Sequence, residues 1–320
     1  MVRAWVQRAK DVSGGWQDVA ALPPHPVRVK VSHSAINYKD ALALTGRSPI
    51  FRAFPMVAGV DLAGTVIDDA SGTYAPGTRV VATGHGIGEQ HWGGYAEEAT
   101  LEPDWLLPLP ERLDNRLAAA IGTAGVTAAM AVDALEHHGI ARDGEVVVTG
   151  PSGGVGGFAL MLLAAAGYRA VAATGRMGEA AYREGVGAAR VIARAELEGE
   201  PRPLGRELWA GGIDVAGGTI LANMLATTCS YGAVAACGLA GSMTLPTTVA
   251  PFILRGVALL GIGSVYPPVA TRTAAWARLG RDAAAGKIET MILDAPFSEA
   301  GRLAEALLAQ QVRGRIVLAW

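Results

Sequence analysis

Cysteine and net charge are both scarce in this sequence. Its 320 residues include two cysteines, Cys229 and Cys237, which rules out a disulfide framework and fits a reducing compartment such as the cytoplasm. Lysine and arginine together number 27 against 29 acidic residues, so the net charge is −2. A protein dedicated to nucleic acid would be clearly basic, and we therefore expect no nucleic-acid partner.

Long hydrophobic runs are absent as well. The most apolar stretches, residues 158–167 and 252–263, are shorter than the about 20 residues that cross a bilayer, and Arg255 interrupts the second. Residues 1–11 carry no apolar segment of the kind found in secretory signals. We therefore expect no membrane partner. Hydrophobic residues still make up 51% of the chain, which is enough for a large buried core.

The arrangement of apolar residues changes along the chain. In the first 120 residues, short β-rich runs at 27–36, 63–68 and 78–84 lie between glycine and proline breaks, which indicates a small barrel or sandwich. From about residue 118, a helix of small residues is followed by alternating strands and helices. These strands are apolar without alternation, which is typical of a parallel sheet covered on both faces. The predicted fold class is α/β.

The segment "VVVTGPSGGVGG", residues 146–157, is rich in glycine. Glycine permits a tight turn and lets backbone amides approach a pyrophosphate, and the N-terminus of the following helix adds unpaired N–H groups. A buried strand before the turn and a small-residue helix after it supply the context that a dinucleotide-binding loop requires. We predict a phosphate-binding loop here; the alternative is a glycine turn that binds nothing.

The next strand ends without the acidic residue that usually holds the ribose of NAD, about twenty residues after the loop. The stretch "AATGR", residues 172–176, ends in Thr174, Gly175 and Arg176. Arg176 offers a permanently charged fork to phosphate oxygens, Thr174 can donate its hydroxyl, and Gly175 leaves room. This chemistry favours NADPH, with Arg194 as a second phosphate partner; the alternative is that Arg176 is a solvated surface charge.

Residues that bind metals are sparse. No cysteine precedes residue 229, and His85 and His91 stand six residues apart in a glycine-rich stretch with Glu89 between them. These three side chains could form a site, but the sequence shows no pattern of residues that would support such ligands, so we expect no metal and interpret this stretch as a turn-rich loop. Hydride transfer to an already polarised C=C bond is the reaction that least needs a Lewis acid.

Five segments resemble a known family. They are "AINYKDALALTGRSPIFRAFPMVAGVDLAGTV" (35–66), "HWGGYAE" (91–97), "GTAGVTAAM" (122–130), "GPSGGVGG" (150–157) and "AACGLAGSMTLPTTVAPFILRGVALLGIGSV" (235–265). The first four resemble the zinc-free quinone oxidoreductase branch of the medium-chain dehydrogenase/reductase superfamily. The last resembles its acrylyl-CoA reductase (YhdH/YhfP-type) subfamily.

The resemblance implies a fold and an activity. It implies a GroES-like catalytic domain formed by residues 1–120 together with 266–320, and a doubly wound Rossmann domain formed by residues 121–265. It also implies a homodimer that uses NADPH to reduce the C=C bond of a small-molecule substrate, acrylyl-CoA or a similar 2-enoyl thioester. In zinc-dependent relatives a cysteine ligand stands near Asn37 and a Gly-His-Glu stands in place of Gly59–Val60–Asp61, so both substitutions agree with a metal-free reductase.

Coenzyme positions are carried over from the family one at a time. Gln310 stands where relatives usually have an asparagine. The positions that match coenzyme contacts are Tyr38, Ser152, Gly153, Gly154, Val155, Thr174, Gly175, Arg176, Arg194, Leu239, Ile253, Ser264 and Gln310. Thr127, early in the "GTAGVTAAM" helix, is a further candidate for contact with the nicotinamide, and packing is its alternative role.

Catalytic candidates lie in "NYKD". Hydride delivery to Cβ develops charge on the thioester oxygen, and Cα then takes a proton. Tyr38 is the candidate for placing the substrate or relaying that proton, and Asn37 is a candidate donor through its amide. Asp40 belongs to the same segment, and it either takes part in the site or compensates the dipole of the predicted helix from its first turn.

Substrate contacts are less defined by the sequence. Arg47 and Arg52, in the loop "RSPIFR", are candidates for the phosphates of coenzyme A or else solvated surface charges. Pro49 stands where relatives tend to have a lysine, which weakens the acyl-CoA assignment. The alternatives are an NADPH:quinone or enone oxidoreductase, and a non-catalytic NADPH-binding protein.

Overall fold

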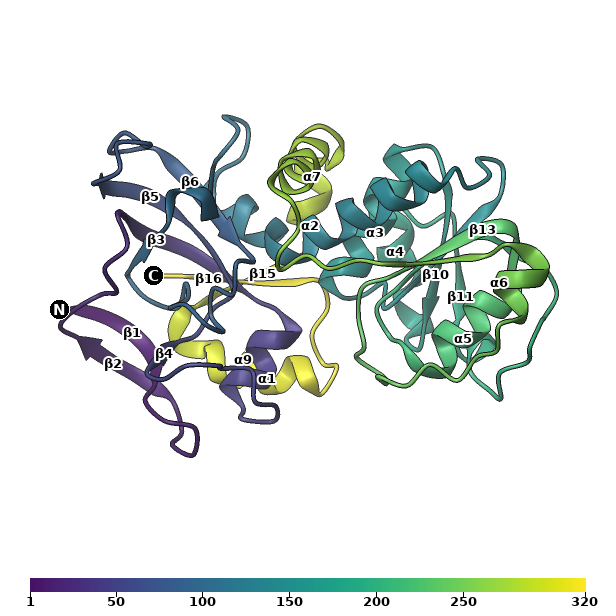
Figure 1. Ribbon diagram of the computed structural model, residues 1–320, viewed down its shortest axis with the longest axis horizontal. Coiled ribbons are helices and arrows are strands. Elements are labelled where there is room, and N and C mark those ends of the chain that lie inside the picture. Colours follow the sequence, from purple (N-terminus) through teal and green to yellow (C-terminus); the bar gives the residue numbers. More distant parts are fainter. The chain divides into compact units, whose positions relative to one another are not determined.

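The computed structural model describes residues 1–320, and the chain folds into two units (Figure 1). The first combines Met1–Thr123 with Met291–Trp320, and the second is Ala124–Thr290. This division differs from the predicted domains at residues 266–290, which pack within the second unit. There Arg278, in helix α7 (Val269–Asp282), forms an ion pair of 2.8 Å with Asp133.

The first unit is built on a seven-stranded sheet in which the C-terminal strand lies beside an N-terminal one. The order is β15-β16-β3-β5-β6-β8, and β7 pairs with β3. Strand β3 alternates buried valines with outward Arg28 and Lys30, as a strand with one face on a core requires. The strands are β3 (Val27–Ile36), β5 (Asp61–Asp69), β6 (Arg79–Thr83), β7 (Glu98–Leu101), β8 (Leu106–Pro108), β15 (Ile292–Pro296) and β16 (Arg315–Ala319).

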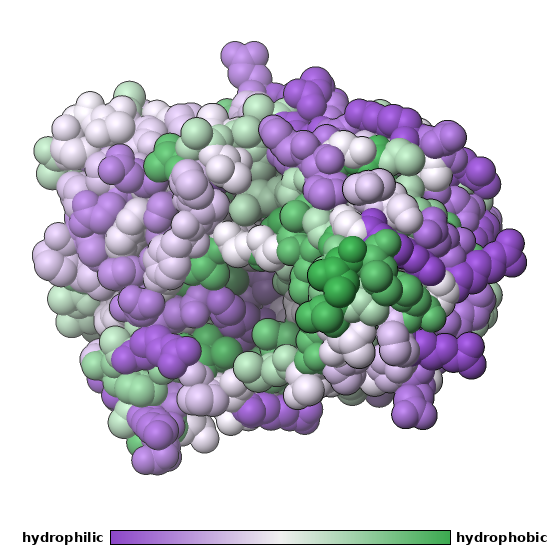
Figure 2. Space-filling model, turned by 45° about the vertical axis from the view of Figure 1, so that its right-hand side comes forward, coloured by the Kyte–Doolittle hydropathy of each residue, from purple (hydrophilic) through white to green (hydrophobic).

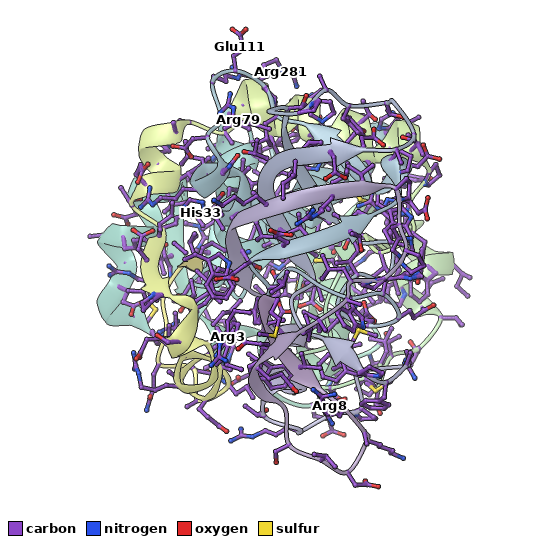
Figure 3. All side chains as sticks on the ribbon, turned by 90° about the vertical axis from the view of Figure 1, so that its left-hand side faces the viewer. Arg3, Arg8, His33, Arg79, Glu111 and Arg281 are labelled. Carbon is purple, nitrogen blue, oxygen red and sulfur yellow. The ribbon has the colours of Figure 1, made fainter.

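A small three-stranded sheet and four short helices complete the first unit. Its strands are β1 (Val2–Gln7), β2 (Gly15–Val19) and β4 (Met56–Val57), in the order β2-β1-β4. Arg3 and Arg8 stand on this sheet and its first turn (Figure 3), where Arg3 pairs with Asp18 and Arg8 donates to Gln17. The helices are α1 (Tyr38–Leu44), η1 (Pro103–Trp105), η4 (Phe297–Glu299) and α9 (Ala300–Leu308).

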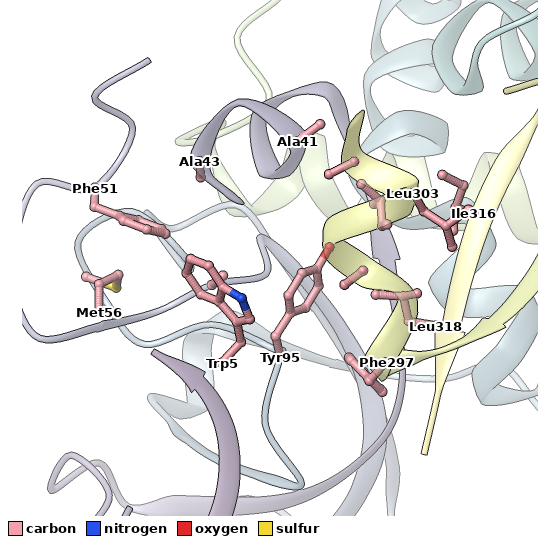
Figure 4. Close-up of a cluster of buried hydrophobic side chains, with 14 residues drawn as sticks. Trp5, Ala41, Ala43, Phe51, Met56, Tyr95, Phe297, Leu303, Ile316 and Leu318 are labelled. Carbon is pink, nitrogen blue, oxygen red and sulfur yellow. The ribbon is translucent and has the colours of Figure 1, made fainter. Parts of the chain in front are cut away.

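An aromatic cluster forms one core of the first unit. Figure 4 shows Tyr95 between Trp5 and Phe297, with Ala41 of α1 and Leu303 of α9 packed around them. The rings of Tyr95 and Phe297 meet edge to face with their centroids 5.7 Å apart. This cluster fixes α1, and with it the start of the "NYKD" segment, to the C-terminal part of the chain.

The second unit contains a parallel sheet of six strands. Their order, β11-β10-β9-β12-β13-β14, is the doubly wound order in which a ligand binds at the carboxyl ends of the central strands. The core of the sheet is almost wholly buried, which explains its continuous apolar sequence. The strands are β9 (Glu145–Thr149), β10 (Arg169–Thr174), β11 (Arg190–Ala193), β12 (Trp209–Asp214), β13 (Thr228–Ala236) and β14 (Ala258–Gly261).

Helix α2 (Asn115–His138) begins in the first unit and is interrupted at Gly122, which has a φ of 43°. It is long and apolar enough to cross a membrane, but 83% of its most apolar window is buried inside the protein. Its apolar side chains therefore serve the interior. The remaining helices are α3 (Gly154–Ala165), η2 (Met177–Glu179), α4 (Ala180–Val186), η3 (Arg194–Leu197), α5 (Gly218–Thr227), α6 (Ala250–Arg255) and α8 (Ala285–Glu289).

Candidate functional site

The predicted phosphate loop closes tightly on the first turn of α3. Gly150 has a φ of 58°, which favours glycine, and a Cβ on Gly156 would collide with the backbone carbonyl of Gly150. The loop therefore lies flat against the helix N-terminus: the Gly153 N–H donates to the carbonyl of Gly150 (3.0 Å), and Gly154 and Val155 carry the first amides of the helix. Such amides have no partner within the helix and, with the helix dipole, attract an anion.

The turn after β10 brings two arginines to the same edge of the sheet. Thr174 accepts a hydrogen bond at Oγ1 from the Arg176 N–H (3.0 Å), which fixes the turn. A Cβ on Gly175 would lie 3.5 Å from the guanidinium carbon of Arg194, so that guanidinium lies over the turn. Both cations are partly exposed and are held by carboxylates, Arg194 by Glu198 (2.7 Å) and Arg176 by Glu179 (3.6 Å).

The other predicted coenzyme residues of the second unit fall into two groups. Thr127 is buried and donates from Oγ1 to Ser264 Oγ (2.7 Å), so the structure brings these two candidates together. Leu239 and Ile253, in contrast, are 58% and 72% exposed. Gln310 belongs to the first unit, directly after α9, with a φ of 58°.

Sequence reasoning did not identify Arg183. This residue of α4 is fully buried and donates to Ser152 Oγ, to the carbonyl of Arg176 (2.8 Å) and to Glu179 Oε2 (3.0 Å). The helix has seven residues, too short for its polar and apolar faces to be separated by periodicity. No signal in the sequence therefore distinguished this arginine from a surface residue.

In the first unit, Asn37 and Tyr38 begin α1. Tyr38 is 46% exposed and its hydroxyl makes no hydrogen bond within the protein. The Asn37 amide donates both hydrogens to carboxylates, to Asp40 (3.1 Å) and to Asp61 (2.7 Å), and its oxygen accepts from Arg315 (3.0 Å). Asn37 thus holds the start of the helix, and its amide hydrogens are already committed within the protein.

Asp40, Asp61 and Arg315 form a buried charged cluster around that amide. Asp40 accepts from the backbone N–H groups of Val60 (2.9 Å) and Asn37 (2.8 Å). An Nη of Arg315 lies 3.7 Å from Asp61, so this guanidinium offsets the charge of that carboxylate. Burial, followed by the nearby charge of Asp61, raises the pKa of Asp40 to about 7.

Asp40 should make the stability of the protein depend on pH. Its ordinary pKa is 3.8, so between that value and about 7 the folded chain holds a proton that the unfolded chain releases. The free energy of unfolding is therefore expected to fall as pH rises through this range, by up to about 1.4 kcal/mol per pH unit. Urea unfolding of the wild type and of Asp40→Asn at several pH values measures this. The variant should lack that decrease, and an equal decrease in both proteins would contradict the assignment.

Comparison with known proteins identifies the family. Residues 23–111 match the Alcohol dehydrogenase GroES-like domain. The chain is 49% identical over 300 residues to the acrylyl-CoA reductase AcuI of Ruegeria pomeroyi, an alignment that covers 93% of this chain and 91% of the relative. The chain belongs to the medium-chain dehydrogenase/reductase superfamily.

Two solved structures of this superfamily match the chain along its length. The yhdH oxidoreductase of Salmonella enterica, in complex with NADP, gives a TM-score of 0.96 at 45% identity and covers 100% of both chains. The yhfP protein of Bacillus subtilis, with NAD bound, gives 0.94 at 38% identity and covers 100% of this chain and 99% of that one. These matches confirm the predicted superfamily and the α/β fold with its GroES-like and Rossmann parts.

In this medium-chain reductase, Glu89 and His91 of the glycine-rich loop make contacts with other side chains. Glu89 pairs with Lys39 (2.7 Å), and the ring of His91 packs on Trp105 with centroids 4.5 Å apart. No group of three or more histidine, cysteine or acidic side chains lies close enough to hold a metal ion.

The two arginines predicted to meet the substrate differ in their surroundings. Arg47 is paired with Glu305 of α9 at 2.6 Å, and both side chains are more than half exposed. Arg52 is exposed and anchored by its backbone N–H, which donates to the carbonyl of Glu89 (2.7 Å). Of the two, only Arg52 has a guanidinium without a partner, so it is the stronger candidate.

Proposed function

We propose that this protein reduces the C=C bond of a 2-enoyl thioester with NADPH, and that acrylyl-CoA is the substrate. The single observation that carries the proposal is the likeness to an acrylyl-CoA reductase at 49% identity over nearly the full length of both chains. The NADP complex of a 45% identical relative supports the coenzyme. The absence of an acidic residue at the end of β10 supports it independently.

The residues of the second unit fit a phosphorylated dinucleotide. A side chain at Gly156 would collide with the carbonyl of Gly150, so the loop at residues 150–157 lies close against the N-terminus of α3, whose first amides would meet a pyrophosphate. Arg176 and Arg194 lie at the same turn and would hold the 2′-phosphate, and Thr127 with Ser264 are proposed to face the nicotinamide. When bound, NADPH supplies the hydride that Cβ of the substrate receives.

Residues of the first unit are proposed to stabilise the negative charge on the substrate and to supply its proton. Negative charge develops on the thioester oxygen and needs a donor, and Cα then needs a proton. The Tyr38 hydroxyl is the candidate for either task because it is partly exposed and has no partner in the protein. Asn37, whose amide is taken by Asp40 and Asp61, acts on this proposal by fixing the helix that carries Tyr38.

Steady-state kinetics with NADPH test the substrate assignment. We expect turnover of acrylyl-CoA at a higher kcat/KM than crotonyl-CoA or a simple quinone. Turnover of the quinone alone would overturn the acyl-CoA assignment and leave the alternative, an NADPH:quinone or enone oxidoreductase. Binding of NADPH without turnover of any of the three would identify a non-catalytic protein.

Tyr38→Phe tests the proposed role of the hydroxyl. We expect kcat with acrylyl-CoA to fall about tenfold while the Kd for NADPH stays unchanged, because the lost hydrogen bond matters only as charge develops on the substrate. Tyr231→Phe, at a side chain 79% exposed in the second unit, is the matched control and should retain full activity. An unchanged kcat in Tyr38→Phe would remove the hydroxyl from the mechanism.

We also propose a homodimer that works in the cytoplasm. Strand β14 is the last strand of the six-stranded sheet, and its unpaired edge can pair with a second copy. Figure 2 shows apolar side chains gathered on the right of the view, and Ile253, Leu254 and Leu259 are exposed on β14 and the adjacent α6. The thiols of Cys229 and Cys237 are free, as expected for a reducing compartment. Light scattering of the purified protein measures the oligomeric state.

A further inference from the structure

We propose that Arg183 is a positioning residue that sets the preference for NADPH over NADH. The proposal rests on the proposed function, since it concerns the same 2′-phosphate site. Arg183 acts through Glu179, an acidic residue that stands three positions after Arg176 and contacts the same turn.

Glu179 lies at the proposed 2′-phosphate site, where an unpaired carboxylate would repel the phosphate. One of its oxygens lies 3.6 Å from Arg176, and the other lies 3.5 Å from the hydroxyl of Ser152 in the phosphate loop. Glu179 lies five residues beyond the end of β10, and like charges repel, so its carboxylate would oppose a 2′-phosphate that Arg176 holds.

Arg183 supplies the charge that offsets Glu179. Its guanidinium, fully buried, donates to Glu179 Oε2 at 3.0 Å, and it also reaches Ser152 Oγ and the carbonyl of Arg176. A buried guanidinium keeps its charge and requires an anionic partner, so the pair is held firmly. One side chain therefore ties the phosphate loop, the turn after β10 and the acidic residue together.

The charge count at the turn shows why this matters. With Arg183, the ion pairs at this turn join three guanidinium groups (Arg176, Arg183 and Arg194) to two carboxylates (Glu179 and Glu198), so these paired groups together carry a net positive charge. Without Arg183 the count is even. A 2′-phosphate of charge close to −2 would then compete with Glu179 for the guanidinium of Arg176, because Glu179 would have lost its ion pair with Arg183.

Arg183→Gln tests the proposal because it keeps hydrogen-bond donors and removes the charge. Kd values for NADPH and NADH are measured by fluorescence titration of the purified protein. We expect the Kd for NADPH to rise about tenfold and that for NADH to change less than about twofold. Adding Glu179→Gln to this variant should return the Kd for NADPH to within about twofold of wild type, because the opposing charge is then gone as well.

Two further variants separate electrostatics from folding. Glu179→Gln alone should lower the Kd for NADPH, an effect opposite in sign to that of Arg183→Gln, and a Kd that does not fall would contradict the proposal even if Arg183→Gln does not fold. Arg169→Gln is the matched control, because Arg169 is 64% exposed at the start of β10 and pairs with Glu145. Its Kd values should equal those of the wild type.

The outcomes distinguish the two proposals. Equal weakening of both coenzymes in Arg183→Gln, or no recovery in the double variant, would overturn the role of Arg183 and leave the NADPH assignment standing. A wild type that binds NADH as tightly as NADPH would overturn the proposed coenzyme preference, and this inference with it.

Discussion

Arg176→Ala is expected to raise the Kd for NADPH about a hundredfold while changing the Kd for NADH less than about threefold. The guanidinium of Arg176 is partly exposed at the turn after β10 and lies 3.6 Å from Glu179. Charge-assisted hydrogen bonds to a phosphate are among the strongest that a side chain makes. NADH has no 2′-phosphate, so loss of the guanidinium should have little effect on its Kd.

Parallel titrations with the two coenzymes measure this effect. Arg169→Ala removes an exposed arginine from the other end of the same strand, so it controls for a general loss of positive charge. An equal rise in both Kd values would mean that Arg176 supports the fold of the turn and does not contact the 2′-phosphate.

Arg315→Met is expected to lower the free energy of unfolding by about 3–5 kcal/mol. Arg315 is buried with Asp61 and also donates to the carbonyl of Ala120 (2.8 Å) and to Asn37 Oδ1 (3.0 Å). Its removal leaves the charge of Asp61 buried with no cation, beside Asp40. Methionine has a similar length, so the loss reports charge and hydrogen bonds more than volume.

Urea unfolding followed by tryptophan fluorescence measures this change, since five of the seven tryptophans lie in the first unit. Arg302→Met is the control: that side chain is 70% exposed, and its loss should cost less than about 1 kcal/mol. Adding Asp61→Asn to Arg315→Met should recover part of the loss. A cost for Arg315→Met as small as that of the control would show that the cluster contributes little to stability.

The elements whose burial is regular were predictable from the sequence. Strand β3 alternates valines with charged residues, and its predicted range, 27–36, is the observed one. The parallel strands of the second unit, such as β12 and β13, were recognised as apolar runs without alternation. The β1–β2 hairpin was missed because "GWQDV" mixes polar and apolar residues without a clear period.

In the candidate site, too, some features were predictable from the sequence and others were not. The turn at residues 150–157 and the turn at Thr174–Arg176 depend on short local patterns, so the sequence predicted both turns, and their contacts with the coenzyme stay a prediction. The cluster of Asp40, Asp61 and Arg315 was not assembled, because its members come from segments up to 275 positions apart and meet only through β16 and β3. Arg183 was missed because burial of an arginine in a short helix leaves no pattern to detect.

The place of β16 has a consequence for synthesis on the ribosome. This strand pairs with β3 along Ile316–Ala319 and carries Arg315, yet it is translated only after the whole second unit, Ala124–Thr290. The second unit is continuous in the chain and has all its strands as soon as it emerges. The first unit must wait with an unpaired strand edge and with Asp40 and Asp61 lacking their cation. The part of the chain that is made first is therefore completed last, and a nascent chain stalled before β16 is a natural substrate for chaperones.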